Sequence, residues 1–326
     1  MSTPVPALDA PTPREIRDAA DRVQGLAVRT PLVRLNVDAP VEIWLKLENL
    51  QPIGSFKLRG AANAMLTTPR SMLDRGVYTA SAGNMAQGVA WVARELGVAC
   101  TVIVPDHAPA TKLAAIERLG GRVVSVPFDR WWRVLQEHSY PGMDGLFVHP
   151  VSDRRVMAGN GTVGVEIAED LPDVDAVLVP YGGGGLSVGI AAALRAVRPA
   201  TRVWACEVET AAPLSASLAA GAAVACDYVP SFVDGIGGKS VLAEMWPLAR
   251  TMLAGALTVP LAEVAAAVRL LVERARVVAE GAGAAPVAAA LRGGTELAGA
   301  RQIVCVVSGG NIDAAKLARI LDGALP

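Results

Sequence analysis

The sequence predicts an α/β fold with two open, twisted and mainly parallel sheets flanked by helices, in which a small domain is inserted in a large one. From Gly76 onward, short apolar segments of strand length alternate with longer segments of helical periodicity. This alternation is typical of parallel sheets with crossover helices. The chain has 326 residues, which is more than one compact core usually serves. We therefore expect a large domain formed by residues 1–75 and 150–326 and a small domain formed by residues 76–149.

The part of the chain before Gly76 predicts an amphipathic helix, a strand and a second helix. The first helix covers residues 14–26, short extended pieces follow it, and residues 43–48 form the strand. A loop over residues 49–54 then leads to Ser55. Because serine is a preferred N-cap residue, the second helix is expected to begin there.

The remaining elements follow the alternating pattern. Strands are expected at residues 77–80, 99–104, 122–126 and 146–149 of the small domain, and at residues 176–180, 203–208 and 303–307 of the large one. Helices are expected at residues 85–96, 110–119, 128–140, 160–170, 186–197, 213–221 and 262–279. Right-handed crossovers between parallel strands would then cover each sheet on both faces.

The composition excludes two classes of partner. The net charge is −1, and Lys and Arg are scattered along the chain, so no basic patch indicates nucleic acid or an anionic membrane surface. No apolar run approaches the ~20 residues that a membrane-spanning helix needs. We therefore expect neither nucleic acid nor a membrane as a partner.

Two features predict a cytoplasmic protein. Residues 1–13 are proline-rich and lack the basic start and apolar segment of a secretion signal, which predicts a flexible tail. The four cysteines, Cys100, Cys206, Cys226 and Cys305, form no Cys-x-x-Cys pair, and three of them lie in or beside apolar segments. Buried, reduced thiols are therefore favoured over disulfides or metal ligands.

Lys57 lies where a helix begins, which is the unfavourable end of the helix dipole for a cation. The dipole costs the ammonium form about 0.3–1 kcal/mol. Lowering a lysine pKa from ~10.4 to near neutrality needs roughly 4 kcal/mol, so burial or covalent chemistry would have to supply the rest. A solvated lysine is the common alternative at an arbitrary position. The other motifs of this chain favour a reactive amine at Lys57.

Four consecutive glycines, Gly182, Gly183, Gly184 and Gly185, join a predicted strand to a helix that begins at Leu186. Their backbone N–H groups are unobstructed by side chains and lie at a helix N-terminus, which favours a phosphate. The pattern is neither Gly-x-Gly-x-x-Gly nor a P-loop, so a dinucleotide or a nucleoside triphosphate fits poorly. A flexible loop is the alternative for an isolated glycine run. The position of this run directly after a strand favours anion binding.

Two other polar segments follow predicted strands. The first joins a strand to a helix and contains Ser81, Ala82, Gly83, Asn84, Met85 and Ala86. Ser81 can cap that helix, the exposed N–H groups could hold a carboxylate, and Asn84 offers both a donor and an acceptor. Ser308 follows the last strand and places a hydroxyl at the carboxyl edge of its sheet. An ordinary Ser/Asn turn is the structural alternative for the first segment.

Taken together, these segments resemble those of the fold type II enzymes that use pyridoxal 5′-phosphate (PLP), which have a tryptophan synthase β-like fold. The resemblance is closest to the threonine/serine dehydratase and serine racemase family, and it extends from about Pro31 to Asp313. The order of the four segments along the chain makes it specific. The segments are residues 55–61, 81–88, 182–186 and 308–311, with further similarity at residues 147–150 and 158–162.

The resemblance implies a role for each of these residues. Lys57 forms the Schiff base with PLP, Phe56 packs against the pyridine ring, and Asn84 hydrogen-bonds the 3′ oxygen. Ser308 hydrogen-bonds the ring nitrogen, which suits loss of a β substituent better than a long-lived carbanion. The phosphate is bound by Gly182, Gly183, Gly184, Gly185 and Leu186. The substrate carboxylate is bound by Ser81 and the N–H groups of residues 83–86.

The activity that the resemblance implies is that of a PLP-dependent dehydratase, or ammonia-lyase. Such an enzyme converts a β-hydroxy-α-amino acid, with threonine, serine and phenylserine as candidates, to a 2-oxo acid and ammonia by α,β-elimination. Lys57 would remove the α proton. The chain ends soon after Asp313, so a catabolic enzyme without a regulatory domain is expected. The resemblance also implies a homodimer.

Two residues depart from the family pattern. Met85 stands where the family usually has histidine, which predicts either a packing change or a more apolar β substituent, such as the phenyl group of phenylserine. Trp131 and Trp132 are compatible with a pocket of that kind. Ala82 stands where serine racemases carry a serine, which argues against racemisation as the main activity.

Two acidic residues have open roles. Glu207 and the Ala211 carbonyl match a divalent-cation site of the racemase-like members, but Pro213 stands where a further carboxylate is expected. Hard cations need several oxygen ligands, so we expect no tightly held divalent metal, and a monovalent ion stays open. Glu280 matches a glutamate that lies near the cofactor in the family. A solvated carboxylate at a helix end is its alternative.

Two other functions remain open. One is β-replacement or threonine synthesis on the same fold, although the Ser-Phe-Lys-x-Arg-Gly form of the lysine motif favours dehydratases. The other is a PLP-binding protein without catalysis. Met85 is the only motif change that supports a loss of turnover, because Lys57, Asn84 and Ser308 are all present.

Overall fold

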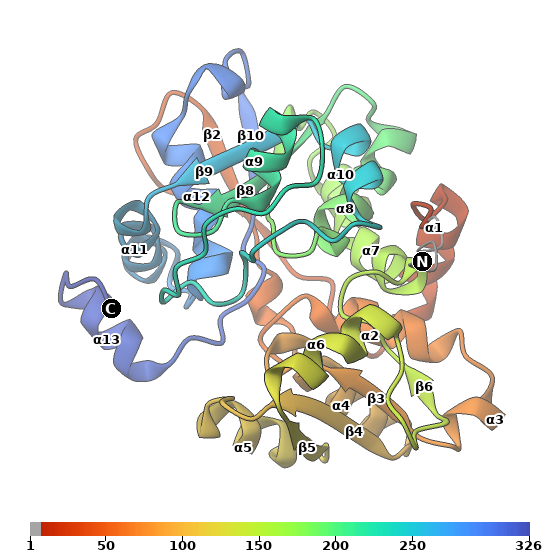
Figure 1. Cartoon of the computed structure of the whole chain (residues 1–326). Helices are drawn as coiled ribbons and strands as arrows, with labels where there is room; N and C mark the ends of the chain where they lie inside the picture. Colours follow the sequence, from red (N-terminus) through yellow and green to blue (C-terminus); the bar gives the residue numbers. More distant parts are fainter. Residues whose placement is uncertain (1–7) are drawn as a thin grey trace.

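A computed structural model describes residues 8–326 and shows two sheets, each covered by helices (Figure 1). Residues 1–7 of the predicted N-terminal tail lie outside the described residues. The larger sheet has six strands in the order β1-β2-β10-β7-β8-β9, and the smaller has four in the order β5-β4-β3-β6. Only β1 and β2 pair antiparallel, and every other pair of neighbours in the described chain is parallel. The predicted fold class is confirmed.

The strands of the smaller sheet are contiguous in the sequence, whereas those of the larger sheet come from both flanks. The smaller sheet consists of β3 (Val77–Ala80), β4 (Cys100–Pro105), β5 (Arg122–Val126) and β6 (Leu146–Phe147). The larger sheet consists of β1 (Leu32–Arg34), β2 (Glu42–Lys46), β7 (Ala176–Pro180), β8 (Arg202–Val208), β9 (Gly255–Val259) and β10 (Gln302–Val306). This composition supports our proposal that residues 76–149 form an inserted small domain.

Thirteen α-helices cover the two sheets in the described part of the chain. The first seven are α1 (Pro13–Arg22), α2 (Lys57–Leu66), α3 (Arg70–Leu73), α4 (Asn84–Glu95), α5 (Ala110–Arg118), α6 (Phe128–Glu137) and α7 (Arg154–Asp170). The others are α8 (Gly185–Val197), α9 (Pro213–Ala220), α10 (Trp246–Met252), α11 (Leu261–Leu270), α12 (Gly281–Arg292) and α13 (Ala314–Leu321). Short 3₁₀ turns cover Glu48–Leu50 and Thr295–Leu297, and a π-helical turn covers Leu271–Ala275.

Most predicted elements are present, but several predicted helix boundaries were wrong. The helix expected at residues 14–26 covers Pro13–Arg22, and the one expected at residues 128–140 ends at Glu137. The helix expected at residues 160–170 begins at Arg154, because the Asp153 side chain accepts a hydrogen bond from the Arg155 N–H at 2.8 Å and caps it. The helix expected at residues 262–279 ends earlier. Its π-helical turn stops at Ala275, and Arg276 takes a left-handed φ of 60°.

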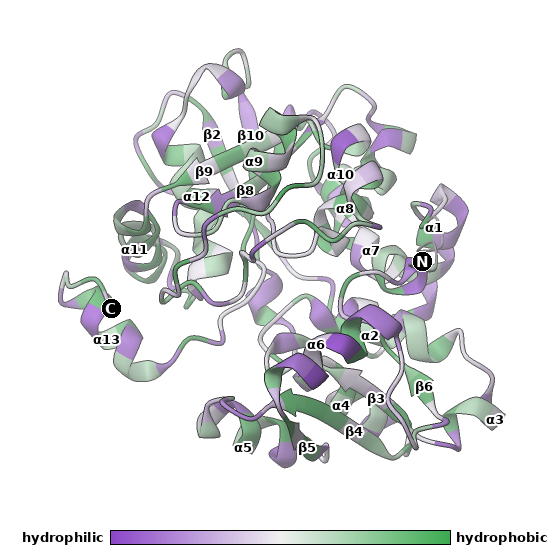
Figure 2. Ribbon diagram, in the orientation of Figure 1, coloured by the Kyte–Doolittle hydropathy of each residue, from purple (hydrophilic) through white to green (hydrophobic). Residues whose placement is uncertain are grey.

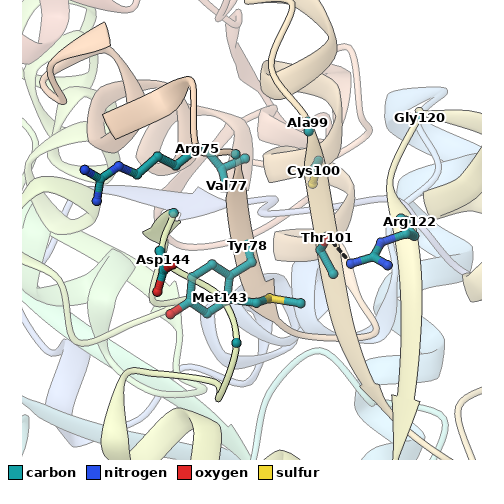
Figure 3. A pocket seen from close by; sticks show the side chains of 13 residues that line it. Arg75, Val77, Tyr78, Ala99, Cys100, Thr101, Gly120, Arg122, Met143 and Asp144 are labelled. Carbon is teal, nitrogen blue, oxygen red and sulfur yellow. Dashed lines mark hydrogen bonds between the residues drawn. The ribbon is translucent and has the colours of Figure 1, made fainter. Parts of the chain in front are cut away.

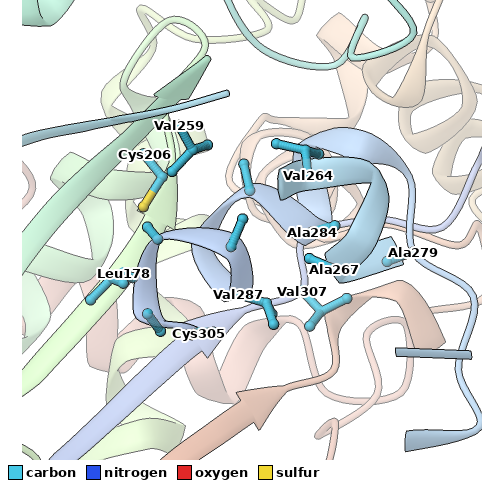
Figure 4. Packing of buried hydrophobic residues seen from close by; sticks show 14 of the residues in the cluster. Leu178, Cys206, Val259, Val264, Ala267, Ala279, Ala284, Val287, Cys305 and Val307 are labelled. Atoms are coloured by element: carbon cyan, nitrogen blue, oxygen red, sulfur yellow. The ribbon is translucent and has the colours of Figure 1, made fainter. Parts of the chain in front are cut away.

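Helix α12 was not predicted, and it forms the centre of the largest core cluster. Its residues from Gly281 to Ala290 are all buried. Figure 4 shows Ala284 and Val287 of this helix among Leu178, Cys206 and Cys305 of the larger sheet. A helix buried on all sides has no polar face and therefore no amphipathic period, and its Gly and Pro residues further obscured it in the sequence.

The hydropathy of the chain follows this layered arrangement. In Figure 2, hydrophobic residues concentrate on strands such as β4, whereas α1 and α6 carry hydrophilic residues. Cys100, Cys206 and Cys305 are buried, Cys226 is half-buried, and all four are free thiols. Among residues 8–326, no helix has both the length and the apolar character needed to cross a bilayer.

Candidate active site

A cavity of about 400 Å³ lies between the two sheets and brings the predicted motifs together. Lys57, the glycine run, Ser308 and the segment after β3 all contribute to its lining. The predicted site residues that line it are Phe56, Lys57, Ser81, Ala82, Gly83, Asn84, Met85, Gly182, Gly183, Gly184, Gly185, Leu186, Glu280 and Ser308. Ala86 does not line it, because its side chain packs in the core of the smaller domain. Only its N–H group could contact a substrate, and that predicted role stays a prediction.

The amine of Lys57 faces this cavity from the first residue of α2. Its Nζ donates to the Pro150 carbonyl oxygen at 2.9 Å and lies 5.1 Å from the centroid of the Phe56 ring. Burial of the side chain lowers the pKa of Lys57 to about 8, although the Glu280 carboxylate opposes that shift. Lys57 is half-buried, because part of its surface is open to the cavity. About a tenth of the amine is therefore neutral at pH 7, against less than about 0.1% for an unperturbed lysine.

Ser55 does not occupy the N-cap position that the sequence predicted. Phe56 is the N-cap residue of α2, and it makes no side-chain capping hydrogen bond. The Ser55 hydroxyl instead accepts a hydrogen bond from the Lys57 N–H at 3.3 Å. The helix consequently begins one residue later than expected, with Lys57 in its first turn.

Arg59 anchors α2 through buried ion pairs and does not line the cavity. Its guanidinium is 1% exposed and pairs with Glu48 at 2.7 Å and with Glu166 at 2.6 Å. Burial disfavours the charge of Glu48, yet the Arg59 guanidinium and its hydrogen bonds hold the pKa of that carboxyl below its usual range. Gly60 lets α2 approach α7 closely, since a Cβ there would lie 2.7 Å from Asn160 Oδ1. These contacts hold α2, and with it the backbone of Lys57, in place.

The glycine run forms a tight turn from β7 into α8. Gly184 has a φ of +96°, which L side chains rarely adopt. A Cβ on Gly183 would lie 2.5 Å from the Val151 side chain. Helix α8 begins at Gly185, and the N–H groups of a first helical turn have no partners within the helix. The turn therefore offers backbone donors and a positive dipole end to an anion in the cavity.

The segment after β3 leads into α4 at the opposite wall of the cavity. Gly83, and not Ser81, is the N-cap residue of α4, so the predicted cap was wrong. The Ser81 hydroxyl accepts from the Gly83 N–H at 3.2 Å and thereby shapes the turn. Asn84 begins the helix, and its Nδ2 donates to Glu280 Oε1 at 2.8 Å. The first-turn N–H groups of α4 thus adjoin the cavity.

Comparison with known proteins decides which family this arrangement represents. The family model described as "Pyridoxal-phosphate dependent enzyme" matches residues 23–309. The chain belongs to this family. An L-threonine ammonia-lyase of Geobacter sulfurreducens is 42% identical over 319 residues, covering 95% of this chain and 78% of the relative. A putative threonine dehydratase of Sinorhizobium fredii is 35% identical over 316 residues, covering 95% of each chain.

Solved structures of similar proteins have the same fold. Maize serine racemase matches with a TM-score of 0.88 and 29% identity, covering 97% of this chain and 98% of its own. The processed form of threonine deaminase isoform 2 from Solanum lycopersicum matches with a TM-score of 0.84 and 30% identity, covering 99% of this chain and 98% of its own. The prediction of a PLP-dependent enzyme of the ammonia-lyase type is confirmed by these matches.

The residues of the cavity fit PLP. Lys57 supplies an amine with a lowered pKa. The glycine turn, where a Cβ on Gly183 or Gly184 would collide with Val151 or Tyr181, supplies donors for a phosphate at the start of α8. Ser308 and Asn84 line the same cavity. That Lys57, the glycine turn, Asn84 and Ser308 hold PLP in their predicted roles is our proposal.

One wall of the cavity is apolar and comes from the smaller sheet and its helices. Phe128 and Trp131 line it from α6, with ring centroids 5.6 Å apart, and Met85 lines it from α4. Met85 is also packed in the core and is 1% exposed. Trp132 does not line the cavity and is 38% exposed. Of the two tryptophans considered from the sequence, only Trp131 contributes to the wall.

Sequence reasoning missed several residues of this cavity, and four of them have contacts that matter here. Lys112 of α5 and Asp234 form an ion pair at 2.9 Å between segments 122 residues apart, and both line the cavity. Phe128 precedes Trp131 by one helical turn, a spacing from which its orientation could have been inferred. Val151 packs against the glycine turn. Asp234 lies in a loop without periodicity, so no pattern in the sequence marked it.

The candidate cation ligands have another structural role. The Glu207 carboxylate accepts hydrogen bonds from the Leu214 N–H at 2.8 Å and from the Ser215 N–H at 2.8 Å, at the N-terminus of α9. Ala211 forms an isolated bridge with Val208 just before that helix. Across residues 8–326, no group of three or more His, Cys, Asp or Glu side chains is arranged to hold a metal ion.

A larger cavity, of about 760 Å³, lies where the strands of the smaller sheet begin (Figure 3). Its lining includes Arg75, Tyr78, Arg122 and Asp144, and Arg122 donates to the Thr101 hydroxyl at 3.3 Å. None of the predicted site residues contributes to it. Volume alone therefore does not identify the active site, whereas the groups that line the smaller cavity do.

Proposed function

We propose that this enzyme is an ammonia-lyase that converts a β-hydroxy-α-amino acid to a 2-oxo acid and ammonia. The observation that carries the proposal is the Lys57 amine, with its pKa lowered to about 8, facing one cavity with the glycine turn and the N-terminus of α4. Relatives named L-threonine ammonia-lyase from Geobacter sulfurreducens and Thermotoga maritima, 42% and 38% identical, support it.

The chain's own groups perform the steps around the cofactor. PLP, when bound, supplies an electron sink for the pair left by the departing α proton. Lys57 would accept that proton at Nζ as its neutral amine. The Ser81 hydroxyl and the N–H groups at the start of α4 hold the substrate carboxylate. The β hydroxyl leaves with a proton as water, and hydrolysis of the product consumes one water, so the net products are one 2-oxo acid and one ammonium ion.

The preferred substrate carries an apolar β substituent. The aromatic side chains of Phe128 and Trp131 support this preference, because a methyl or phenyl group gains from burial against apolar side chains. Met85 packs in the core beside them and is 1% exposed, so it contributes little surface. Met85 offers no strong hydrogen-bond partner to a polar β substituent. Threonine and phenylserine are therefore the favoured candidates, and serine is the weaker one.

The test is product formation from a single amino acid. The purified enzyme is incubated separately with L-threonine, L-serine and L-threo-phenylserine, and 2-oxo acid and ammonia are measured together. Equal amounts of both products, without a second substrate, are expected. A requirement for an added nucleophile would instead establish β-replacement. A PLP-loaded protein that turns over none of a broad β-hydroxy amino acid panel would establish a non-catalytic PLP-binding protein.

A further inference from the structure

We infer that Glu280 and Asn311 are positioning residues that hold the side-chain amide of Asn84 as a hydrogen-bond donor toward bound PLP. Asn84 begins α4, Glu280 precedes α12, and Asn311 lies in the loop after β10. The inference rests on the cofactor of the family and on the proposed contact between Asn84 and PLP. It does not depend on which amino acid is the substrate.

The Asn311 amide is fixed in one orientation. Its Nδ2 donates to the Ile53 carbonyl oxygen at 2.9 Å and to Asn84 Oδ1 at 2.8 Å. A main-chain carbonyl can only accept, so the NH₂ group of Asn311 must face Ile53. Because Asn311 Nδ2 also donates to Asn84, the amide of Asn84 must turn its oxygen toward Asn311 and its nitrogen to the opposite side.

Glu280 receives the nitrogen of Asn84 on that opposite side. The distance from Asn84 Nδ2 to Glu280 Oε1 is 2.8 Å, and Glu280 is 6% exposed. The Glu280 N–H donates to the Gly309 carbonyl oxygen at 3.0 Å, which ties its backbone to the loop after β10. The ionised Glu280 carboxylate accepts from an amide N–H and would repel the oxygen of a flipped Asn84. Burial raises the pKa of Glu280 to about 7, and a protonated Glu280 could donate to that oxygen, so the orientation of Asn84 is set first by Asn311.

Gly309 provides the space for this arrangement. A Cβ at that position would lie 2.6 Å from Glu280 Oε1 and 3.2 Å from Asn84 Nδ2. Any side chain there would therefore displace the hydrogen bond between these two groups.

The two neighbours leave Asn84 with one free donor. An asparagine amide has two N–H groups on its nitrogen, and Glu280 accepts one of them. The second is left for an acceptor in the cavity, which in the proposed role of Asn84 is the 3′ oxygen of PLP. If the amide turned over, its oxygen would meet both the ionised Glu280 carboxylate and the cofactor oxygen, and the two contacts would become repulsive.

The dissociation constant of PLP, measured by absorbance titration of the apoprotein, tests the inference without any turnover. Asn84→Ala is expected to raise Kd about tenfold, the effect of one lost hydrogen bond. Glu280→Gln and Asn311→Leu are each expected to raise Kd several-fold. Asn311→Asp is expected to raise Kd more than Asn311→Leu does, because a carboxylate oxygen would face and repel Asn84 Oδ1. In the Asn84→Ala background, none of these substitutions raises Kd further.

Asn49→Ala is the matched control. Asn49 does not line the cavity, and its side chain donates to the main-chain carbonyl of Val278, so the substitution also removes an asparagine hydrogen bond. It is expected to leave Kd unchanged. Effects that add to that of Asn84→Ala, or single variants with unchanged Kd, overturn the inference. Thermal unfolding of each apoprotein identifies variants that do not fold. If Glu280→Gln does not fold, the Kd values of Asn311→Leu and Asn311→Asp test the inference. Wild-type protein that binds PLP without lyase activity overturns the proposed function alone.

Discussion

Two neighbouring tryptophans of α6 have different surroundings, and they provide a matched pair for testing substrate preference. Trp131 lines the cavity, whereas Trp132 is 38% exposed and does not. Trp131→Ala is expected to lower kcat/KM for L-threo-phenylserine about tenfold or more and to affect L-serine less, because the lost contact involves the β substituent. Initial rates of 2-oxo acid formation give both values. Trp132→Ala should leave their ratio unchanged, and an equal loss for both substrates in Trp131→Ala would contradict the assigned wall.

The amine of Lys57 should titrate in the apoprotein far below a free lysine. Burial lowers its pKa to about 8, against ~10.4 for an unperturbed lysine. Only the neutral amine reacts with acetic anhydride, so the reactivity of Lys57 is expected to rise with pH and level off above a midpoint near 8. Competitive acetylation followed by mass spectrometry measures this, with N-acetyl-lysine amide as the reference. A midpoint that matches the reference would show that the amine is solvated.

The sequence predicted the site residues that lie in recognisable motifs, at strand ends or at the start of a helix, and it missed others that reach the cavity from elsewhere. Lys57 and Gly182 to Gly185 were found because their residue types are unusual at the start of a helix or after a strand. Lys112 and Asp234 contribute through contacts between distant segments, which no local pattern records. Ser81 was assigned as a helix cap from its residue type, but the turn after β3 places Gly83 at that position instead.

At the scale of elements, the position of α2 depends on the buried charges around Arg59. Arg59 is 1% exposed and pairs with Glu48 and Glu166. Removing one partner of a buried ion pair leaves an uncompensated charge, so Arg59→Ala is expected to cost about 3–5 kcal/mol of unfolding free energy. Denaturant unfolding of the apoprotein measures the loss.

An exposed arginine provides the control for that experiment. Arg70 pairs with Asp74 at 2.8 Å, but the two side chains are 62% and 57% exposed. Solvent screens such pairs, so Arg70→Ala is expected to cost less than about 1 kcal/mol. Similar losses for the two substitutions would refute a structural role for the buried cluster.

The loop between β6 and α7 should make the fold sensitive to acid. His149 Nδ1 accepts hydrogen bonds from the Val151 and Ser152 N–H groups at 3.0 and 2.6 Å. Burial, and then the stacked His138, lower the pKa of His149 from 6.5 to about 3. The unfolded chain therefore binds a proton that the folded chain does not. Stability is unaffected by this group above pH 6.5 and falls as pH decreases from 6.5 toward 3.

A difference between wild type and a histidine variant isolates this effect. Each pKa unit corresponds to about 1.4 kcal/mol, so the contribution of His149 reaches several kcal/mol at low pH. His149→Gln keeps a hydrogen-bond acceptor without a titrating group, and its unfolding free energy is expected to depend less on pH from 6.5 down toward 3. Identical pH dependence in both proteins would contradict the assignment.

The elements that the sequence predicted well are those with a clear period. The strands and helices between Val77 and Glu137 match their expected positions to within a few residues, because each has one polar and one apolar face or is a short apolar run. Helix α12 was missed because it is buried on every side. Strand β9 was missed because its Gly-Ala-Leu-Thr-Val sequence begins with a glycine and follows an unpredicted helix, α10.

At the scale of the whole molecule, the cavity exists because two sheets place their strand ends on either side of it. The glycine turn and Ser308 come from the larger sheet, and the segment from Ser81 to Met85 comes from the smaller one. The pair Lys112 and Asp234 joins the two sides near the cavity. A ligand site at the carboxyl ends of parallel strands was predictable from the strand pattern alone. The contacts that join the two domains at the cavity, such as the ion pair of Lys112 and Asp234, could only be seen in the structure. The homodimer stays a prediction, which sedimentation of the holoenzyme checks.

The most direct test of the account is to locate the covalent attachment of PLP. Borohydride reduction of the holoenzyme, followed by peptide mass spectrometry, identifies the lysine that carries the cofactor. The account predicts a single pyridoxyl-modified residue, Lys57, and a Lys57→Ala protein that lacks both the modification and 2-oxo acid formation. Modification of another lysine, or 2-oxo acid formation that survives in Lys57→Ala, would contradict it.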